Sequence, residues 1–255
     1  MNVGLIGAGA IATYVLGEMK KERDLKATSV FVRNEEKYKH LEEYGVTLYT
    51  DFEAFLNSGI DIVVEAAGVA AAKQWLPTVV QKKDVILISI GALADEPFLQ
   101  EITEVLETNG HNLYLPSGAI AGLDFVQNIK AAGLLQEVSL ETRKPAHTLT
   151  DEPLTEEKVV FEGIAKEAIK LYPKNVNVSI ALPLAGLGIN DTKMTLVADP
   201  NATENSHTIT VIGETGTATF NISNKPLPTN PNSSYQAAVS ILGTLKKINS
   251  NIKVG

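Results

Sequence analysis

The chain contains no cysteine among its 255 residues. Disulfides, thiolate catalysis and cysteine-ligated zinc or iron–sulfur sites are therefore excluded. Histidine is also scarce, with four residues, and no group of His, Asp and Glu shows the spacing typical of a metal site. We accordingly expect a protein that binds no metal.

The chain also lacks an excess of basic residues and any long apolar run. Its 22 Lys and Arg residues are outnumbered by 30 Asp and Glu, which gives a formal net charge of −8. Nucleic acids and anionic membranes are bound by clustered cations, so neither partner is expected. No run of about 18 apolar residues is present, and the first residues predict a strand rather than a secretory signal. These features predict a cytoplasmic protein.

Apolar runs alternate with amphipathic stretches through the first half of the chain. Strands are expected at residues 2–6, 27–32, 47–48, 60–65, 84–89 and 112–115. Helices are expected between them, at residues 10–21, 35–44, 52–57, 70–82 and 96–109. Strands that alternate with helices at this spacing indicate βαβ units, so the fold class expected is α/β with a doubly wound parallel sheet of the Rossmann type.

The pattern changes after Pro116. Strands are expected at residues 138–143, 193–199, 206–212 and 217–223. Helices are expected at residues 162–171, 176–187 and 234–247, with a further one entered from the Gly- and Ala-rich loop 117–132. Successive strands without intervening helices predict a smaller α+β domain with a mixed or antiparallel sheet. We therefore expect a dinucleotide-binding domain at 1–117, a catalytic domain at 118–230, and a C-terminal helix within 231–255 that packs back on the first domain.

The turn Gly7-Ala8-Gly9-Ala10-Ile11-Ala12 follows the first predicted strand and opens the first helix. In this context Gly7 permits a tight turn, Gly9 lets the backbone approach a pyrophosphate, and the small Ala12 lets helix and strand pack closely. The helix N-terminus favours phosphate. The sequence therefore predicts a nicotinamide-dinucleotide site with contacts from Gly7, Gly9, Ala10 and Ile11.

The end of the second predicted strand bears on the choice of cofactor. Enzymes that use NAD usually carry an acidic residue there, whereas this chain has Arg33. Because arginine can pair with a 2′-phosphate, NADP is expected to bind at least as readily as NAD; the alternative is that Arg33 is a solvated loop charge. Ala67 and Gly68 follow the fourth strand, and their small size suits close approach of the nicotinamide ribose.

Several longer motifs match a known family over nearly the whole chain and in the same order. They are Val64-Glu65-Ala66-Ala67-Gly68, Ser89-Ile90-Gly91-Ala92-Leu93-Ala94-Asp95, Pro116-Ser117-Gly118-Ala119-Ile120-Ala121-Gly122-Leu123-Asp124, Thr142-Arg143-Lys144-Pro145, Tyr172-Pro173-Lys174-Asn175-Val176-Asn177-Val178, Ala198-Asp199-Pro200 and Asn205-Ser206-His207-Thr208-Ile209. Together they resemble the L-aspartate dehydrogenases, which are NAD(P)-dependent and have a homoserine-dehydrogenase-like second domain. One small departure is Tyr172, where Phe is common.

The resemblance implies oxidative deamination of L-aspartate to iminoaspartate, oxaloacetate and ammonia, reversible as reductive amination, with an imine that can feed NAD biosynthesis. It also implies a catalytic role for His207 and cofactor contacts from Ala119, Asn175 and Asn177. For the two asparagines, helix capping is a competing explanation.

The four histidines are not equally good candidates for the acid–base residue. His40 and His111 are expected to be solvated, and His147 lies in the loop after Lys144 and remains a second candidate. His207 begins a strand and is flanked by Asn205, at a position where a ring nitrogen can be held in one tautomer. An ordinary pKa near 6.5 would let His207 accept a proton from the amine or activate water, and the alternative is a hydrogen-bonded residue at a strand edge.

A dicarboxylic amino acid requires cations near the reacting carbon. Arg143, Lys144 and Lys174 lie in the second-domain motifs and are the candidates, together with Asn205. Two other functions remain open: a dehydrogenase of another small amino or hydroxy acid, and an NADP-binding sensor without catalysis. The apolar strands of the second domain predict a homodimer.

Overall fold

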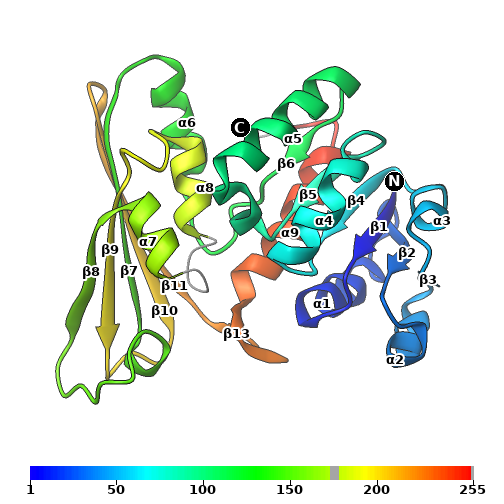
Figure 1. The fold of residues 1–255 in the computed structure, drawn as a ribbon, viewed down its shortest axis with the longest axis horizontal. Helices are drawn as coiled ribbons and strands as arrows, with labels where there is room; N and C mark the ends of the chain where they lie inside the picture. Colours follow the sequence, from blue (N-terminus) through cyan, green and yellow to red (C-terminus); the bar gives the residue numbers. More distant parts are fainter. Residues whose placement is uncertain (173–177, 254–255) are drawn as a thin grey trace. The chain divides into compact units, whose positions relative to one another are not determined.

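The computed structural model describes residues 1–172 and 178–253 of the chain (Figure 1). The chain divides into two compact units. Unit 1 comprises Met1–Gly118, Leu227–Ser233 and Ala237–Gly255, and unit 2 comprises Ala119–Pro226 and Ser234–Gln236. Within the described residues, no helix combines the length and the apolar character that crossing a membrane requires.

The centre of unit 1 is a parallel sheet of six strands. The strands are β1 (Asn2–Ile6), β2 (Lys26–Phe31), β3 (Thr47–Tyr49), β4 (Ile62–Glu65), β5 (Asp84–Leu87) and β6 (Leu113–Tyr114). Their order in space is β3-β2-β1-β4-β5-β6, and each neighbouring pair is parallel. The order reverses between β1 and β4, so the crevice for a ligand is expected outside the carboxyl ends of these two strands. The predicted doubly wound sheet is confirmed.

The helical segments of unit 1 follow the expected alternation, apart from an additional 3-10 segment at 90–94 and a difference at 35–44. They are α1 (Ala10–Met19), α2 (Glu35–Tyr38), η1 (Lys39–Tyr44), α3 (Phe52–Leu56), α4 (Val69–Val79), η2 (Ile90–Ala94), α5 (Glu96–Asn109) and α9 (Tyr235–Asn249). The single helix expected over 35–44 is instead one α-helical turn followed by a 3-10 segment. That segment ends at Gly45, whose φ of +81° is favourable for glycine.

Both faces of the parallel sheet are covered. Val3 and Leu5 of β1 belong to a buried cluster that also contains Leu16 of α1 together with Ile241 and Leu245 of α9. Gly4 faces the other way: a Cβ placed on it would lie 2.9 Å from the ring of Phe55 in α3 and 2.7 Å from Ile60. Because a strand alternates its faces, the small Gly4 lets the layer that contains α3 approach the sheet closely.

Unit 2 contains a mixed sheet of five strands. Its elements are α6 (Leu123–Ala131), β7 (Leu135–Pro145), η3 (Ala146–Thr148), β8 (Lys158–Ile164), α7 (Ala165–Leu171), α8 (Val178–Ala185), β9 (Lys193–Asp199), β10 (Asn205–Gly213) and β11 (Gly216–Asn224). The strand order is β11-β10-β7-β9-β8. The short strands β12 (Pro226–Leu227) and β13 (Asn230–Ser234) follow in the chain and form a separate two-stranded sheet, most of it in unit 1. The predicted α+β class with a mixed sheet is confirmed.

Helices cover one face of this sheet, as Figure 1 shows for α6, α7 and α8. Val138, Leu140 and Thr142 of β7 are buried on that face, and they pair in register with Val211, Ile209 and His207 of β10. A Cβ on Gly213 would lie 2.8 Å from Ile129 of α6, which shows that this helix packs on the same face. His207 is therefore at the end of a buried row, next to Asn205 and Ser206 where β10 begins.

One expectation for the second half was wrong. The helix expected from residue 162 begins only at Ala165, because residues 158–164 form β8, which pairs antiparallel with β9 at the edge of the sheet. The sheet was expected to be mixed or antiparallel, and it is mixed: β9 pairs parallel with β7, and β7 rather than β9 is the neighbour of β10. Tertiary pairing determined both outcomes, and local pattern does not reveal it.

Candidate functional site

The turn between β1 and α1 has the geometry of a phosphate-binding turn. Gly7 has a φ of +102°, and a Cβ there would come within 2.8 Å of the Ala67 Cα and 2.9 Å of the Ala66 carbonyl oxygen. A Cβ on Gly9 would meet no atom within 4 Å, and no side chain caps the N-terminus of α1. The turn thus packs closely on one side and leaves open space beside the first N–H groups of a helix, which fits a dinucleotide pyrophosphate.

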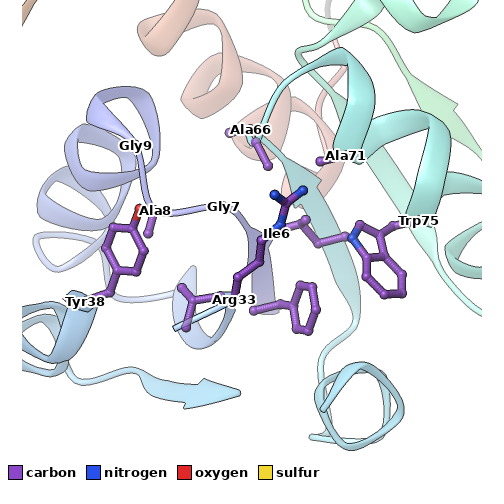
Figure 2. A pocket seen from close by; sticks show the side chains of 12 residues that line it. Ile6, Gly7, Ala8, Gly9, Arg33, Tyr38, Ala66, Ala71 and Trp75 are labelled. Carbon is purple, nitrogen blue, oxygen red and sulfur yellow. The ribbon is translucent and has the colours of Figure 1, made fainter. Parts of the chain in front are cut away.

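A pocket of about 320 Å³ lies at this turn. Its lining residues are Ile6, Gly7, Ala8, Gly9, Phe31, Val32, Arg33, Tyr38, Ala66, Ala67, Ala71 and Trp75. Figure 2 shows the Arg33 guanidinium reaching into the pocket, with Tyr38 beside Ala8 on one side and Trp75 on the other. Of the predicted cofactor contacts in unit 1, the pocket includes Gly7, Gly9, Arg33 and Ala67. Ala10 and Ile11 form the first turn of α1, and Gly68 directly precedes α4.

Aromatic packing supports one wall of the pocket. The Trp75 ring lies 4.1 Å from the Phe52 ring and 5.2 Å from the Phe31 ring, measured between centroids. Neither Trp75 nor Tyr38 was among the site residues expected from the sequence. The indole lies on α4 and the phenol on α2, so only the fold brings them to the same pocket as Arg33.

Glu65, the last residue of β4, is a buried carboxyl beside this pocket and is 1% exposed. Its Oε1 accepts hydrogen bonds from the backbone N–H groups of Ala67 (2.8 Å) and Gly68 (3.0 Å), and its Oε2 accepts one from Ser89 N–H (3.2 Å). Burial raises the pKa of Glu65, and hydrogen bonds from the Ser89 side chain and these amides oppose that rise. The sequence marked Glu65 only as part of a family motif.

In unit 2, His207 of β10 is 3% exposed and its Nδ1 lies 3.0 Å from the hydroxyl oxygen of Thr142 in β7. Burial, and secondarily the charge of Lys144, lowers the pKa of His207 to about 4. This pKa lies well below the ordinary value of 6.5, so the ring is neutral at neutral pH. The hydrogen-bond partner of the ring is Thr142, which the sequence did not indicate because the two residues lie 65 positions apart.

Lys144 lies two residues after Thr142 on the same strand, so its side chain leaves β7 on the face that carries His207. Its effect on the pKa of His207 places the two groups within electrostatic range. Burial lowers the pKa of Lys144 to about 8. The face thus combines a neutral imidazole with an amine that gains or loses its charge in the mildly alkaline range.

Arg143 leaves β7 on the opposite face. Its guanidinium pairs with Glu157, with Asp199 at 3.2 Å and with Glu141 at 3.6 Å, and hydrogen bonds to Glu157 and Asp199 raise its pKa. The structure therefore brings Lys144, and not Arg143, to the face of His207.

The other expected residues lie as follows. Asn205 begins β10 and pairs in register with Asn224 of β11. Ala119 is buried, and its carbonyl oxygen accepts a hydrogen bond from the Asn224 side chain at 2.9 Å. Lys174, Asn175 and Asn177 lie outside the described residues.

The remaining histidines differ in exposure. His40 and His147 are exposed. His111 is half-buried, and its Nδ1 lies 3.3 Å from the Asp84 carboxylate. Over residues 1–172 and 178–253, no group of three or more His, Asp and Glu side chains could hold a metal ion.

Comparison with known proteins decides the family. Residues 7–116 match the NAD-binding domain of homoserine dehydrogenase, and residues 124–248 match the C-terminal domain of aspartate dehydrogenase. L-aspartate dehydrogenases of Methanopyrus kandleri and Methanosarcina barkeri are 36% and 35% identical to this chain. The alignments cover all of this chain and 98% and 99% of those proteins. The chain belongs to the aspartate dehydrogenase family.

Solved structures agree with this membership. Aspartate dehydrogenase from Thermotoga maritima superposes with a TM-score of 0.82 at 30% identity, covering all of this chain and 99% of that one. A homoserine dehydrogenase from Thiobacillus denitrificans, at 15% identity and a TM-score of 0.64, shares the fold. The predicted aspartate dehydrogenase family, the oxidoreductase class and the NAD(P)-binding Rossmann domain are thus confirmed.

Proposed function

We propose that this protein catalyses the NAD(P)-dependent oxidation of L-aspartate. The Cα–H would leave as hydride to the nicotinamide, the amine would lose a proton, and the resulting iminoaspartate would add water and release ammonia to give oxaloacetate. The reverse direction is reductive amination. The observation that carries this proposal is the buried His207–Thr142 pair beside Lys144, in a domain that matches the aspartate dehydrogenase C-terminal domain.

In unit 1, Gly7, Gly9, Ala10 and Ile11 would hold the pyrophosphate through backbone N–H groups, with Ala67 and Gly68 against the nicotinamide ribose. Arg33 reaches into the same pocket and would pair with a 2′-phosphate, so we infer that NADP binds at least as well as NAD. When bound, the cofactor supplies the hydride acceptor. The sequence resemblance supports further contacts from Ala119, Asn175 and Asn177.

In unit 2, we infer that His207 handles the proton. With a pKa of about 4, the imidazole is neutral at working pH. If the Thr142 hydroxyl accepts the Nδ1 hydrogen, the Nε2 lone pair is left to accept a hydrogen bond from the amine or from the water that attacks the imine. Thr142 would then act through His207 by selecting its tautomer.

Lys144 would bind a substrate carboxylate, since of Arg143 and Lys144 it is the one that shares a face with His207. Arg143 is engaged by three carboxylates, which argues against a role as the clamp. Lys174 and Asn205 remain candidates for the second carboxylate on the sequence motifs alone.

We also propose that the protein is a cytoplasmic homodimer whose imine product feeds NAD biosynthesis. The sheet face opposite α6–α8 carries the half-buried Thr195, Thr208 and Thr210, which offer a surface of small side chains to a second copy. Light scattering coupled to size exclusion would give twice the chain mass for a dimer; the monomer mass would refute it.

The activity is tested by mixing the purified protein with L-aspartate and either NAD or NADP at alkaline pH and following the reduced nicotinamide at about 340 nm. Reduction with L-aspartate, and much slower reduction with homoserine, L-alanine or L-malate, supports the proposal. Faster reduction with one of the other substrates would reassign the substrate. If the protein binds the dinucleotide but reduces it with none of these substrates, the result would favour an NADP-binding sensor without catalytic activity.

A further inference from the structure

Glu65 is a buried carboxyl to which the proposed chemistry gives no role. Its two oxygens receive hydrogen bonds from Ala67 N–H and Gly68 N–H on one side and Ser89 N–H on the other. Gly68 N–H also lies 3.1 Å from the Ser89 hydroxyl, which in turn bonds to Glu65. One side chain thus closes a small network of polar groups, in which Glu65 and Ser89 are buried whereas Ala67 and Gly68 lie at the surface.

The network joins two loops at the carboxyl edge of the parallel sheet. Ala67 and Gly68 lie between β4 and α4, and Ser89 lies between β5 and η2. Strands β4 and β5 are neighbours, with Glu65 and Leu87 in register. Since loops at this edge form the ligand site in doubly wound folds, a side chain that ties two of them together sets the shape of that site.

The loop held by Glu65 is also in contact with the phosphate turn. Ala66 and Ala67 line the pocket, and Gly7 lies so close to Ala67 that a Cβ would fall 2.8 Å from its Cα. A shift of the 66–68 backbone would therefore change the wall of the pocket and the packing behind Gly7 together. A displacement of about 1 Å at such a wall is enough to weaken binding or turnover strongly.

We propose that Glu65 is a positioning residue for the dinucleotide: its carboxylate holds Ala67, Gly68 and Ser89 in the arrangement that receives the nicotinamide ribose. This proposal rests on the proposed cofactor site of unit 1. It is independent of the substrate, because every group involved belongs to the dinucleotide-binding sheet and its loops.

Glu65→Gln tests the proposal with little change of shape. Glutamine keeps one acceptor oxygen but replaces the other by an NH₂ donor, so at least one set of backbone N–H groups loses its acceptor. We expect the Kd of the folded variant for NADPH, measured by nicotinamide fluorescence, to rise at least about tenfold. Amide hydrogens of residues 66–68 and 89 should exchange faster. Glu65→Asp keeps two acceptors at shorter reach and should show a smaller rise.

Asp61→Asn is the matched control. Asp61 precedes the same strand at the other edge of the sheet, where its carboxylate accepts the Asn2 N–H at 2.7 Å. This variant also loses a carboxylate–amide bond, but its Kd for NADPH should equal that of the wild type. The midpoint of thermal unfolding, measured for each variant without cofactor, shows whether a change in Kd is accompanied by a loss of stability.

A Glu65→Gln protein that binds NADPH and NADH with wild-type Kd, even at a lower thermal midpoint, would overturn the positioning role and leave a structural one. If Glu65→Gln does not fold, an unchanged Kd in Glu65→Asp would overturn it equally. Wild-type protein that binds the dinucleotide tightly but does not oxidise L-aspartate would refute the proposed substrate and leave this comparison valid.

Discussion

At the scale of single residues, Arg143 and Lys144 show how strand geometry separates neighbours. Both follow Thr142 in a family motif, and the sequence offers both as substrate cations. Successive side chains of a strand leave on opposite faces, so only Lys144 shares the face of His207. Arg143 is neutralised by carboxylates that come from β7, β9 and the segment before β8.

Lys144 predicts a pH dependence of inhibitor binding. Succinate has both carboxylates of the substrate and no amine, so its own charge is constant above neutral pH. The ammonium of Lys144, with a pKa of about 8, loses its charge as the pH rises through that value. The inhibition constant of succinate should therefore rise above pH about 8, approaching tenfold per pH unit.

Substitutions at Lys144 make this test specific. Lys144→Arg keeps its charge and should bind succinate without the alkaline loss. Lys144→Met should bind it weakly at every pH. Weak binding in Arg143→Met together with wild-type binding in Lys144→Met would reverse the assignment of the clamp.

His207 predicts a pH dependence of stability. Its folded pKa of about 4 lies below the ordinary value of 6.5, so the unfolded chain binds the proton more tightly. The free energy of unfolding should therefore fall as the pH drops from about 6.5 toward about 4, by an amount on the order of 3 kcal/mol from this group. Urea unfolding of the wild type and of His207→Gln checks this: the variant should lose less stability over that range, and parallel curves would contradict the shift.

At the scale of elements, the two glycines of the β1–α1 turn have different roles: Gly7 is required for packing, and Gly9 borders the space for the ligand. Gly7→Ala should destabilise the protein by about 2–4 kcal/mol, because the site has positive φ and its Cβ meets backbone. Gly9→Ala has an ordinary φ of −80° and open space around it, so stability should change by less than about 0.5 kcal/mol. Its methyl group would occupy the pyrophosphate space.

Thermal melts and NADPH titration check this pair of substitutions. We expect Gly9→Ala to melt like the wild type and to bind NADPH at least about tenfold more weakly. Wild-type affinity in Gly9→Ala would show that the turn does not receive the pyrophosphate.

Most elements of the first half could be predicted because residues close in sequence, such as helix caps and alternating apolar runs, mark where each element begins and ends. The helix Glu96–Asn109 begins at the Asp95 cap and ends at Gly110 in the left-handed region, and both of its bounds agree with the prediction. Strand β8 could not be predicted, because Lys158–Ile164 is an edge strand stabilised by pairing with β9. The parallel pairing of β7 with β9 has no local signal either.

At the scale of the whole molecule, the sequence indicated individual candidate residues of the site, but it did not indicate which residues contact one another. Glycine spacing indicated the tight turn between β1 and α1, and motif resemblance singled out His207 as a candidate. Thr142, Glu65 and Trp75 were not singled out because each has a partner in a distant segment, namely His207, Ser89 and Phe52. The depressed pKa of His207 was missed for the same reason, since burial depends on the packed helices and not on the residues beside it.

The central claim is that hydride passes from the α-carbon of L-aspartate to a dinucleotide. L-Aspartate deuterated at that carbon, incubated with the protein and NADP or NAD, tests it most directly when the reduced cofactor is analysed by mass spectrometry. The account predicts a reduced nicotinamide that carries the deuterium, and almost none formed by His207→Gln, whose turnover should fall at least about 100-fold. A reduced cofactor without deuterium, or no reduction by the wild type with either dinucleotide, would contradict it.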